Sequence, residues 1–403
     1  MAQTKLKTDF LRYVCQTSSE PMGIEVDRAE GCWITDRSGK RYLDFISGIG
    51  VANLGHAHPV VVKAVADQAP RFLHVMVYGE FIQETQVRLA ERLAQNVPRP
   101  LSVTYFTNSG TEANEGALKT AKKFTKRKKL VAFKNGFHGD SQGSLSVTGR
   151  DVYRKPFRPL LPDVTFLPFN EIKSLKAVDR RTAAVIVEPI QGEGGVNLPD
   201  DDFLSTLRRR CDETGALLIF DEVMTGMGRT GNLFAFEHWN VVPDILVLAK
   251  ALGGGMPLGA FIGRPEIMKT LSENPPLSHV TTFGGHPVCC AAGLAALDYL
   301  IGNKLPERAE RLGEYLTDRL YKLSEIGGVK DVRGKGLLIG FELETANLTK
   351  RFVRNCRYAG LVLGWTLHSD TVIRLAPPLI ISEQEIEQGI DIMWKALSQE
   401  LKK

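Results

Sequence analysis

The chain has 403 residues, of which 43% are hydrophobic and 24% are charged, so it can bury a large core and form two or more domains. Its net charge of +5 is too mild to favour nucleic acid as a partner. The six cysteines form no CxxC pair or Cys/His cluster, and no signal peptide or run of about eighteen apolar residues is present, so we expect a cytoplasmic protein without a metal site, disulfides or a membrane span.

Seven short apolar runs bounded by turn residues predict buried strands. They lie at 103–107, 130–133, 164–168, 184–189, 217–223, 245–249 and 259–263. Helical patterns separate several of them, as at 112–126 and 202–213. This alternation predicts an α/β fold, in which helices cover both faces of a largely parallel sheet.

The pattern changes at about residue 290, where two long helical segments follow one another without a strand. Short strands are predicted around LLIGFEL and VIRLAPPLI, and Ser382 with Glu385 has the spacing of a capping box that opens a last helix. We therefore predict a domain boundary near residue 290.

A tight turn, Ser109-Gly110-Thr111, follows the first predicted strand and opens a helix. The free N–H groups and the dipole of such a helix start suit a phosphate, which Gly110 would let approach closely and Thr111 would bind through its hydroxyl. An ordinary capped helix that binds nothing has the same pattern.

Phe137 and His138 lie between glycines in a loop after the second predicted strand, where a flat ring could stack on a cofactor or simply anchor the loop. Glu188 ends the fourth predicted strand, and Glu193 lies in the glycine-rich loop beyond it. Arg374 stands alone in an apolar strand, so it needs a carboxylate partner, which could be a protein acid or a substrate.

Asp221 and Lys250 lie at the ends of two apolar runs, and in open α/β sheets reactive groups gather beyond the carboxyl ends of the strands. A desolvated lysine can form a Schiff base with an aldehyde, and an aspartate can pair with the pyridinium nitrogen of pyridoxal phosphate. The glycines at 226, 228 and 231 match GxGxxG, but they do not open a helix directly after a strand, which argues against a dinucleotide site.

Seven motifs in this order, SGTEAN, NGFHG, VEPIQGEGG, FDEVMTGMGRTG, PDILVLAKALGGGMPLGA, TTFGGHP and IRLAPPL, resemble those of the class III (omega) aminotransferases, with the acetylornithine and ornithine branch most similar. The resemblance covers nearly the whole chain. It implies the fold type I architecture of enzymes that depend on pyridoxal 5'-phosphate, with a mostly parallel seven-stranded sheet in a large domain (51–290). A smaller α/β C-terminal domain (291–403) would pack with an N-terminal segment (1–50).

The resemblance also implies roles for the cofactor site. Lys250 would hold the cofactor covalently and then shuttle a proton, Asp221 would keep the pyridine nitrogen protonated, and Phe137 and Val223 would contact opposite ring faces. The rest of the implied site consists of Ser109, Gly110, Thr111, His138, Met224 and, from the neighbouring subunit of a homodimer with active sites at its interface, Thr282.

Glu188 would be an acid near the cofactor, and Glu193 with Arg374 would form a carboxylate switch. Glu193 masks Arg374 while an omega-amino donor binds, and moves away when glutamate or 2-oxoglutarate binds. The implied reaction moves the terminal amino group of an acetylornithine- or ornithine-like donor to the 2-oxo acid.

Two positions depart from the ornithine enzymes, which have a glutamine where Met224 stands and a tyrosine where Ile49 stands. Met224 resembles the glutamate-1-semialdehyde aminomutase pattern, so an aminomutase or racemase stays an alternative, as do a 4-aminobutyrate or other omega-amine transaminase and a relative without catalysis. His74 and Tyr78 are candidates for the entrance of the site.

Overall fold

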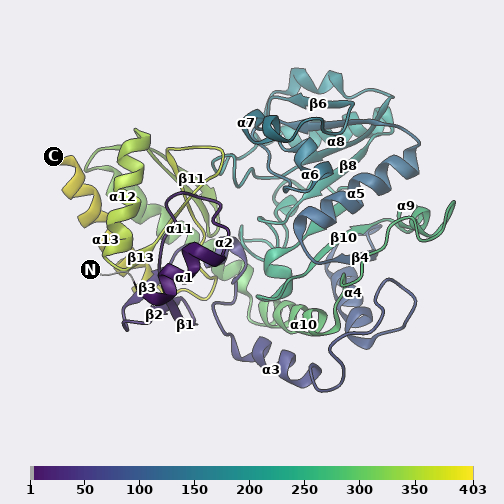
Figure 1. The fold of residues 1–403 in the computed structure, drawn as a ribbon. Coiled ribbons are helices and arrows are strands. Elements are labelled where there is room, and N and C mark those ends of the chain that lie inside the picture. Colours follow the sequence, from purple (N-terminus) through teal and green to yellow (C-terminus); the bar gives the residue numbers. More distant parts are fainter. Residues whose placement is uncertain (1–3, 403) are drawn as a thin grey trace.

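The computed structural model describes residues 4–402, which form two lobes (Figure 1). The larger lobe is built on a seven-stranded sheet of order β4-β10-β9-β8-β7-β5-β6. Its strands are β4 (Val103–Thr107), β5 (Lys129–Phe133), β6 (Val164–Leu167), β7 (Thr182–Val187), β8 (Leu217–Asp221), β9 (Ile245–Leu248) and β10 (Gly259–Gly263). All seven predicted strands therefore form, with ends that shift by up to two residues.

The sheet is mostly parallel, as predicted, but β10 runs antiparallel to both β4 and β9. The connection from β9 to β10, residues 249–258, is shorter than the dozen or so residues that a parallel crossover needs. The chain therefore turns back directly after β9, and this turn contains Lys250.

Helices cover the sheet of the larger lobe, and α10 packs beneath it against α3 and α4 (Figure 1). The two predicted helices form as α5 and α8, displaced by one or two residues. The α-helices of this lobe are α3 (Pro59–Gln68), α4 (Glu84–Asn96), α5 (Gly110–Thr125), α6 (Gln142–Val147), α7 (Asp151–Arg154), α8 (Phe203–Thr214), α9 (Pro265–Met268) and α10 (Pro287–Gly302). The 3₁₀ helices are η1 (Lys155–Phe157), η2 (Ile172–Ala177), η3 (Ala235–Trp239), η4 (Lys250–Gly253) and η5 (Lys269–Ser272).

The smaller lobe joins the two ends of the chain. One sheet has the order β1-β2-β3-β13, in which β3 and β13 are parallel, and the other is antiparallel with the order β11-β12-β15-β14. Their strands are β1 (Val26–Glu30), β2 (Trp33–Asp36), β3 (Arg41–Asp44), β11 (Val329–Lys335), β12 (Leu338–Leu343), β13 (Leu361–Val362), β14 (Gly364–Trp365) and β15 (Val372–Leu375). The helices are α1 (Lys5–Tyr13), α2 (Ser47–Gly50), α11 (Leu305–Ser324), α12 (Ala346–Tyr358) and α13 (Glu383–Leu401).

The C-terminal predictions hold at the level of elements. The two long helical patterns form α10 and α11, and α13 begins with the predicted capping box, in which Ser382 and Glu385 bond each other's backbone N–H groups at 2.9 and 3.1 Å. The sequence did not predict β1–β3, because β1 is largely exposed and polar and β2 and β3 have only four residues each. The division into three parts at residues 50 and 290 stays a prediction.

Within residues 4–402, no single helix is long and apolar enough to cross a membrane. Helices α10 and α11 pass such a test only as a pair, and they meet at an angle of 66°. Most apolar side chains of α10 are buried against the rest of the protein.

Candidate active site

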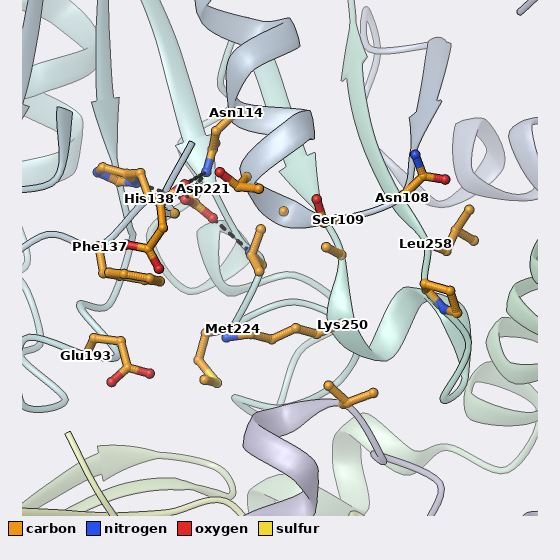
Figure 2. A pocket seen from close by; sticks show the side chains of 18 of the residues that line it. Asn108, Ser109, Asn114, Phe137, His138, Glu193, Asp221, Met224, Lys250 and Leu258 are labelled. Atoms are coloured by element: carbon orange, nitrogen blue, oxygen red, sulfur yellow. Dashed lines mark hydrogen bonds and ion pairs between the residues drawn. The ribbon is translucent and has the colours of Figure 1, made fainter. Parts of the chain in front are cut away.

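A cavity of about 510 Å³ lies where β7, β8 and β9 end and α5 begins (Figure 2). Its size is typical of a site for a small molecule or cofactor, and its place beyond the carboxyl ends of parallel strands is the usual one for such folds. The lining brings together eleven of the predicted site residues, namely Ser109, Gly110, Thr111, Phe137, His138, Glu188, Glu193, Asp221, Val223, Met224 and Lys250.

The N-terminus of α5 forms one end of the cavity. Ser109 caps the helix by accepting a hydrogen bond from the backbone N–H of Glu112 at 3.3 Å. The Glu112 carboxylate accepts from Asn108 rather than from the Ser109 backbone, so only half of a capping box forms. A Cβ on Gly110 would lie 2.9 Å from the Val223 side chain, so the helix start approaches the cavity in a way that only glycine allows.

Asp221, at the end of β8, is held by three donors. Its Oδ2 accepts from Asn114 Nδ2 at 2.7 Å and pairs with His138 Nδ1 at 2.8 Å, and its Oδ1 accepts from the Val223 N–H at 3.0 Å (Figure 2). A carboxylate offers about four acceptor positions, so one is left for a donor in the cavity. The side chain is 3% exposed and its geometry is therefore fixed before any ligand arrives.

Lys250 follows β9 and extends its side chain across the cavity towards Met224 (Figure 2). Its backbone has a φ of 50°, a left-handed conformation that costs energy in a residue with a side chain. Burial, and next the positive charge of Arg374, lower the pKa of Lys250 to about 8, although Glu193, Asp221 and Glu188 oppose this shift. A substantial fraction of the amine is therefore neutral, and nucleophilic, near neutral pH.

Glu188 faces the same space from the end of β7. Its carboxylate accepts from the backbone N–H groups of Phe137 at 2.8 Å and Gly192 at 3.0 Å. Burial raises the pKa of Glu188 to about 7, and nearby Asp221 also raises it. The contact to Phe137 fixes the loop that carries the ring into the cavity.

Glu193 and Arg374 form a buried ion pair between the two lobes, with Glu193 Oε1 bound to a terminal nitrogen of Arg374. Glu193 lines the cavity and Arg374 does not, so the acid separates the guanidinium from the open space. Burial alone would raise the pKa of Glu193, but Arg374 and the Leu367 N–H lower it below its ordinary value. Of the two partners that the sequence left open for Arg374, the protein acid is the one in this conformation.

Several predicted residues lie outside the cavity lining. Thr282 is exposed and, like Ile49 at 50% exposure, does not line the cavity of its own chain. His74 packs its ring against Phe283 at 5.0 Å and, like Tyr78, also lies outside the lining. Within residues 4–402, none of these residues lines the cavity that contains Lys250.

Sequence reasoning missed Asn114 and Asp140. Asn114 bridges Asp221 and the carbonyl of His138, and its position four residues after Gly110 puts both on one face of α5, which could have revealed it. Asp140 lines the cavity with an exposed side chain, and no ion-pair or hydrogen-bond partner for its carboxylate is found among residues 4–402. Its significance depends on the loop geometry, which the sequence does not reveal.

A lysine, an aspartate and a helix start around one cavity in an α/β fold are the groups expected in an enzyme that uses pyridoxal 5'-phosphate. The chain belongs to the class III aminotransferase family, whose model matches residues 14–397. It is a PLP-dependent aminotransferase, as predicted.

Individual relatives agree with this assignment. The chain is 44% identical to the acetylornithine aminotransferase of Methanopyrus kandleri over 91% of its length and 92% of the relative, and 42% identical to that of Aquifex aeolicus over 93% and 97%. Among solved structures, the ornithine aminotransferase of Toxoplasma gondii ME49 has a TM-score of 0.92 and 31% identity, over 100% of this chain and 97% of the other.

The residues present fit this cofactor. The backbone of α5 can receive a phosphate beside Gly110, the fourth acceptor position of Asp221 can receive a pyridinium N–H, and the amine of Lys250 can reach an aldehyde. The cofactor can contact each of these groups without breaking an ion pair that the group already makes.

Proposed function

We propose that this enzyme moves the terminal amino group of an acetylornithine-like donor to 2-oxoglutarate. The observation that carries the proposal is the Glu193–Arg374 pair, because it keeps a carboxylate-binding group in reserve behind the wall of the cavity. The similarity to acetylornithine aminotransferases over almost the full chain supports the choice of donor.

We propose that the cofactor binds at the end of the cavity formed by the N-terminus of α5, which we name the cofactor end. Backbone N–H groups at Gly110 and Thr111 would hold the phosphate with the positive end of the α5 dipole, and Asp221 would hold the pyridinium nitrogen. Phe137 and Val223 would contact the two ring faces. When bound, pyridoxal phosphate accepts the electron pair released as a proton leaves the substrate carbon.

Lys250 is proposed to attach the cofactor through Nζ and, once released, to carry the proton. Its depressed pKa leaves the amine able to accept a proton from the carbon that bears the donor's amino group and to return it on the other side of the C–N bond. Glu188 is buried beside this path, and its raised pKa would limit the negative charge near the cofactor.

The two substrates are proposed to share one pocket through movement of Glu193. While the donor binds by its terminal amine, Glu193 stays on Arg374, so the guanidinium is neutralised and no carboxylate is required of the ligand there. When 2-oxoglutarate binds, its α-carboxylate replaces Glu193 on Arg374. A bidentate arginine pair of this kind is strong and specific in geometry.

A homodimer with active sites at its interface is part of the proposal. Exposed apolar side chains gather in the segments 73–82 and 277–283, which include Leu73, Phe81, Ile82, Leu277 and Phe283 at 53–96% exposure. Patches of this kind favour a protein partner. A second copy seated there would bring its Thr282 towards the phosphate, and the six free cysteines agree with a cytoplasmic location.

One observation favours a second class of donor. The exposed Asp140 carboxylate at the cavity would attract a second cation, as in a diamine, and would repel a donor's carboxylate.

Met224 packs beside Gly192 and Gly50 and offers no strong hydrogen bond to a cofactor oxygen, so the aminomutase or racemase alternative also needs a test.

The test is a two-step spectroscopic assay on the purified holoenzyme. Each of acetylornithine, ornithine, 4-aminobutyrate and putrescine is added without an oxo acid, and the absorbance of the aldehyde form of the cofactor is followed. Then 2-oxoglutarate or, as a control without the second carboxylate, pyruvate is added. We expect acetylornithine to deplete the absorbance fastest and only 2-oxoglutarate to restore it.

Other outcomes assign the alternatives. Faster depletion by putrescine would favour a diamine donor, and restoration by pyruvate as readily as by 2-oxoglutarate would contradict the choice of 2-oxoglutarate as the acceptor. Sustained turnover without any oxo acid would identify an aminomutase or racemase.

A further inference from the structure

Glu193 is held by more than Arg374. Residues 366–370, which connect β14 to β15 and which we name the latch segment, contact it twice. The Leu367 N–H donates to Glu193 Oε2 at 2.9 Å, and the His368 N–H donates to the Glu193 carbonyl at 3.0 Å. The acid therefore loses a backbone donor as well as an ion pair when it leaves Arg374.

The latch segment is itself anchored to the larger lobe, beside α7. The Leu367 carbonyl accepts from Arg150 at 3.0 Å and from the Tyr153 hydroxyl at 2.7 Å. This carbonyl belongs to the same planar peptide unit as the His368 N–H that reaches Glu193, so fixing one end of the unit fixes the direction of the other. Bonds at both ends also polarise the peptide and strengthen each other.

A second anchor acts through His368. Its Nδ1 contacts the Asn135 carbonyl at 2.8 Å, and its ring stacks on Tyr153 with centroids 5.4 Å apart and planes at 24°. The His368 side chain is buried, whereas Tyr153 is 38% exposed and lies outside the cavity lining. Tyr153 thus contacts the latch segment from outside the space where substrate binds.

We propose that Arg150 and Tyr153 determine specificity by setting how readily Glu193 releases Arg374 to a substrate carboxylate. The inference rests on the proposed function. With the anchors in place, the Leu367 N–H stays aimed at Glu193 and the masked state dominates. Without these anchors the latch segment is held less firmly, and Glu193 leaves Arg374 at a lower cost in free energy.

The two substrates respond differently to such a change. A ligand that needs the minor, unmasked state has an apparent affinity proportional to the population of that state, whereas a ligand of the dominant state is almost unaffected by a small shift. Weakening the anchors therefore strengthens dicarboxylate binding and leaves amine binding nearly unchanged. A purely structural contact would instead weaken both.

The experiment measures glutarate, a dicarboxylate without a reactive carbonyl, by calorimetric titration of the holoenzyme. Tyr153→Phe removes the hydroxyl and keeps the stacked ring. Tyr321→Phe is the matched control, because Tyr321 is also half-exposed and donates to a backbone carbonyl, that of Val332 at 3.2 Å, without contacting the latch segment. Should Tyr153→Phe fold poorly, Arg150→Gln removes the other anchor.

We expect glutarate to bind about threefold to tenfold more tightly to Tyr153→Phe than to wild type, which is the effect of one neutral hydrogen bond. The KM for the amino donor should stay within about twofold. An affinity equal to that of Tyr321→Phe, weaker glutarate binding, or equal shifts for both ligands would overturn the inference.

A third variant separates this result from the proposed function. Arg374→Gln should abolish glutarate binding in either background. If wild type and Arg374→Gln bind glutarate equally well, the carboxylate switch itself fails and the inference with it. If binding requires Arg374 but ignores Tyr153, only the inference is overturned.

Discussion

The two ends of the cavity are built differently. At the cofactor end, Gly110, Asp221 and Lys250 lie at the ends of strands or the start of a helix within one lobe, and Asp221 has three fixed donors. At the substrate end, Glu193 lies in a loop of the larger lobe and pairs with Arg374 in β15 of the smaller lobe.

This difference separates chemistry from specificity. The rigid end presents the same groups whichever substrate arrives, because backbone hydrogen bonds of the sheet position them. The other end contains a carboxylate that an incoming carboxylate can replace, and its energy depends on a loop. Changes at the first end should therefore abolish every reaction, whereas changes at the second should affect one substrate and spare the other.

The largest effect is expected for Lys250→Ala, which removes both the attachment point and the proton carrier. Turnover with every donor should fall by about 10⁴-fold or more, and the absorbance of the covalently attached cofactor should disappear. A circular dichroism spectrum like that of wild type would show that the fold is retained. Residual turnover above a thousandth of wild type would contradict the role of Lys250.

Asp221→Asn should be nearly as severe, because it removes the negative charge but keeps the shape. We expect kcat to fall by about 10² to 10³ with all substrates. Asp244→Asn is the control, since Asp244 is equally buried, accepts from the Leu218 N–H and pairs with Arg208, but lies away from the cavity. Asp244→Asn should lower the melting temperature and leave kcat unchanged. A similar loss of kcat in both variants would contradict a specific role of Asp221 in the reaction.

Arg374→Gln should divide the two half-reactions. We expect kcat/KM for 2-oxoglutarate to fall by about 10² or more, because a carboxylate loses a charged partner, whereas the donor should still convert the cofactor at saturating concentration. Rapid mixing with each substrate in turn measures both steps. Equal losses in the two half-reactions would mean that a change at the substrate end, like one at the cofactor end, affects both substrates alike.

The smallest effect concerns pH. Since the pKa of Lys250 is lowered to about 8, the neutral amine needed to capture the cofactor increases about tenfold from pH 7 to pH 9 and then reaches a plateau. An unshifted lysine would keep gaining up to its ordinary value of 10.5. The rate of cofactor binding to the apoenzyme measures this directly.

The same shift has a consequence for stability, with the opposite sign to that of a salt-bridged lysine. Between pH 8 and 10.5 the unfolded chain binds more protons at this position than the folded one, so the free energy of unfolding of the apoenzyme should rise with pH there. A Lys250→Met variant should lack this rise, and an identical pH profile for both proteins would contradict the shifted pKa.

Much of the cofactor end could be predicted from the sequence, whereas at the substrate end the sequence predicted Glu193 and Arg374 but not the loop contacts that hold Glu193. Strands β4 to β10 are apolar runs, and the residues that end them, such as Asp221 and Lys250, follow from where the runs stop. β1 has no buried residue, so its sequence shows no alternation of apolar and polar positions. The contacts of Leu367 with Tyr153 and Glu193 join segments more than 170 residues apart. They use backbone atoms of Leu367, which every residue type has, so the sequence does not predict them.

The pairing of β3 with β13 also bears on how the protein is made. Leu43 is synthesised more than 300 residues before its strand partner Leu361. The N-terminal segment must therefore wait without its sheet neighbour during most of synthesis. Because Val51, a few residues beyond β3, lines the cavity, we expect the wall on that side to be completed only after β13 has been synthesised, later than every strand of the seven-stranded sheet.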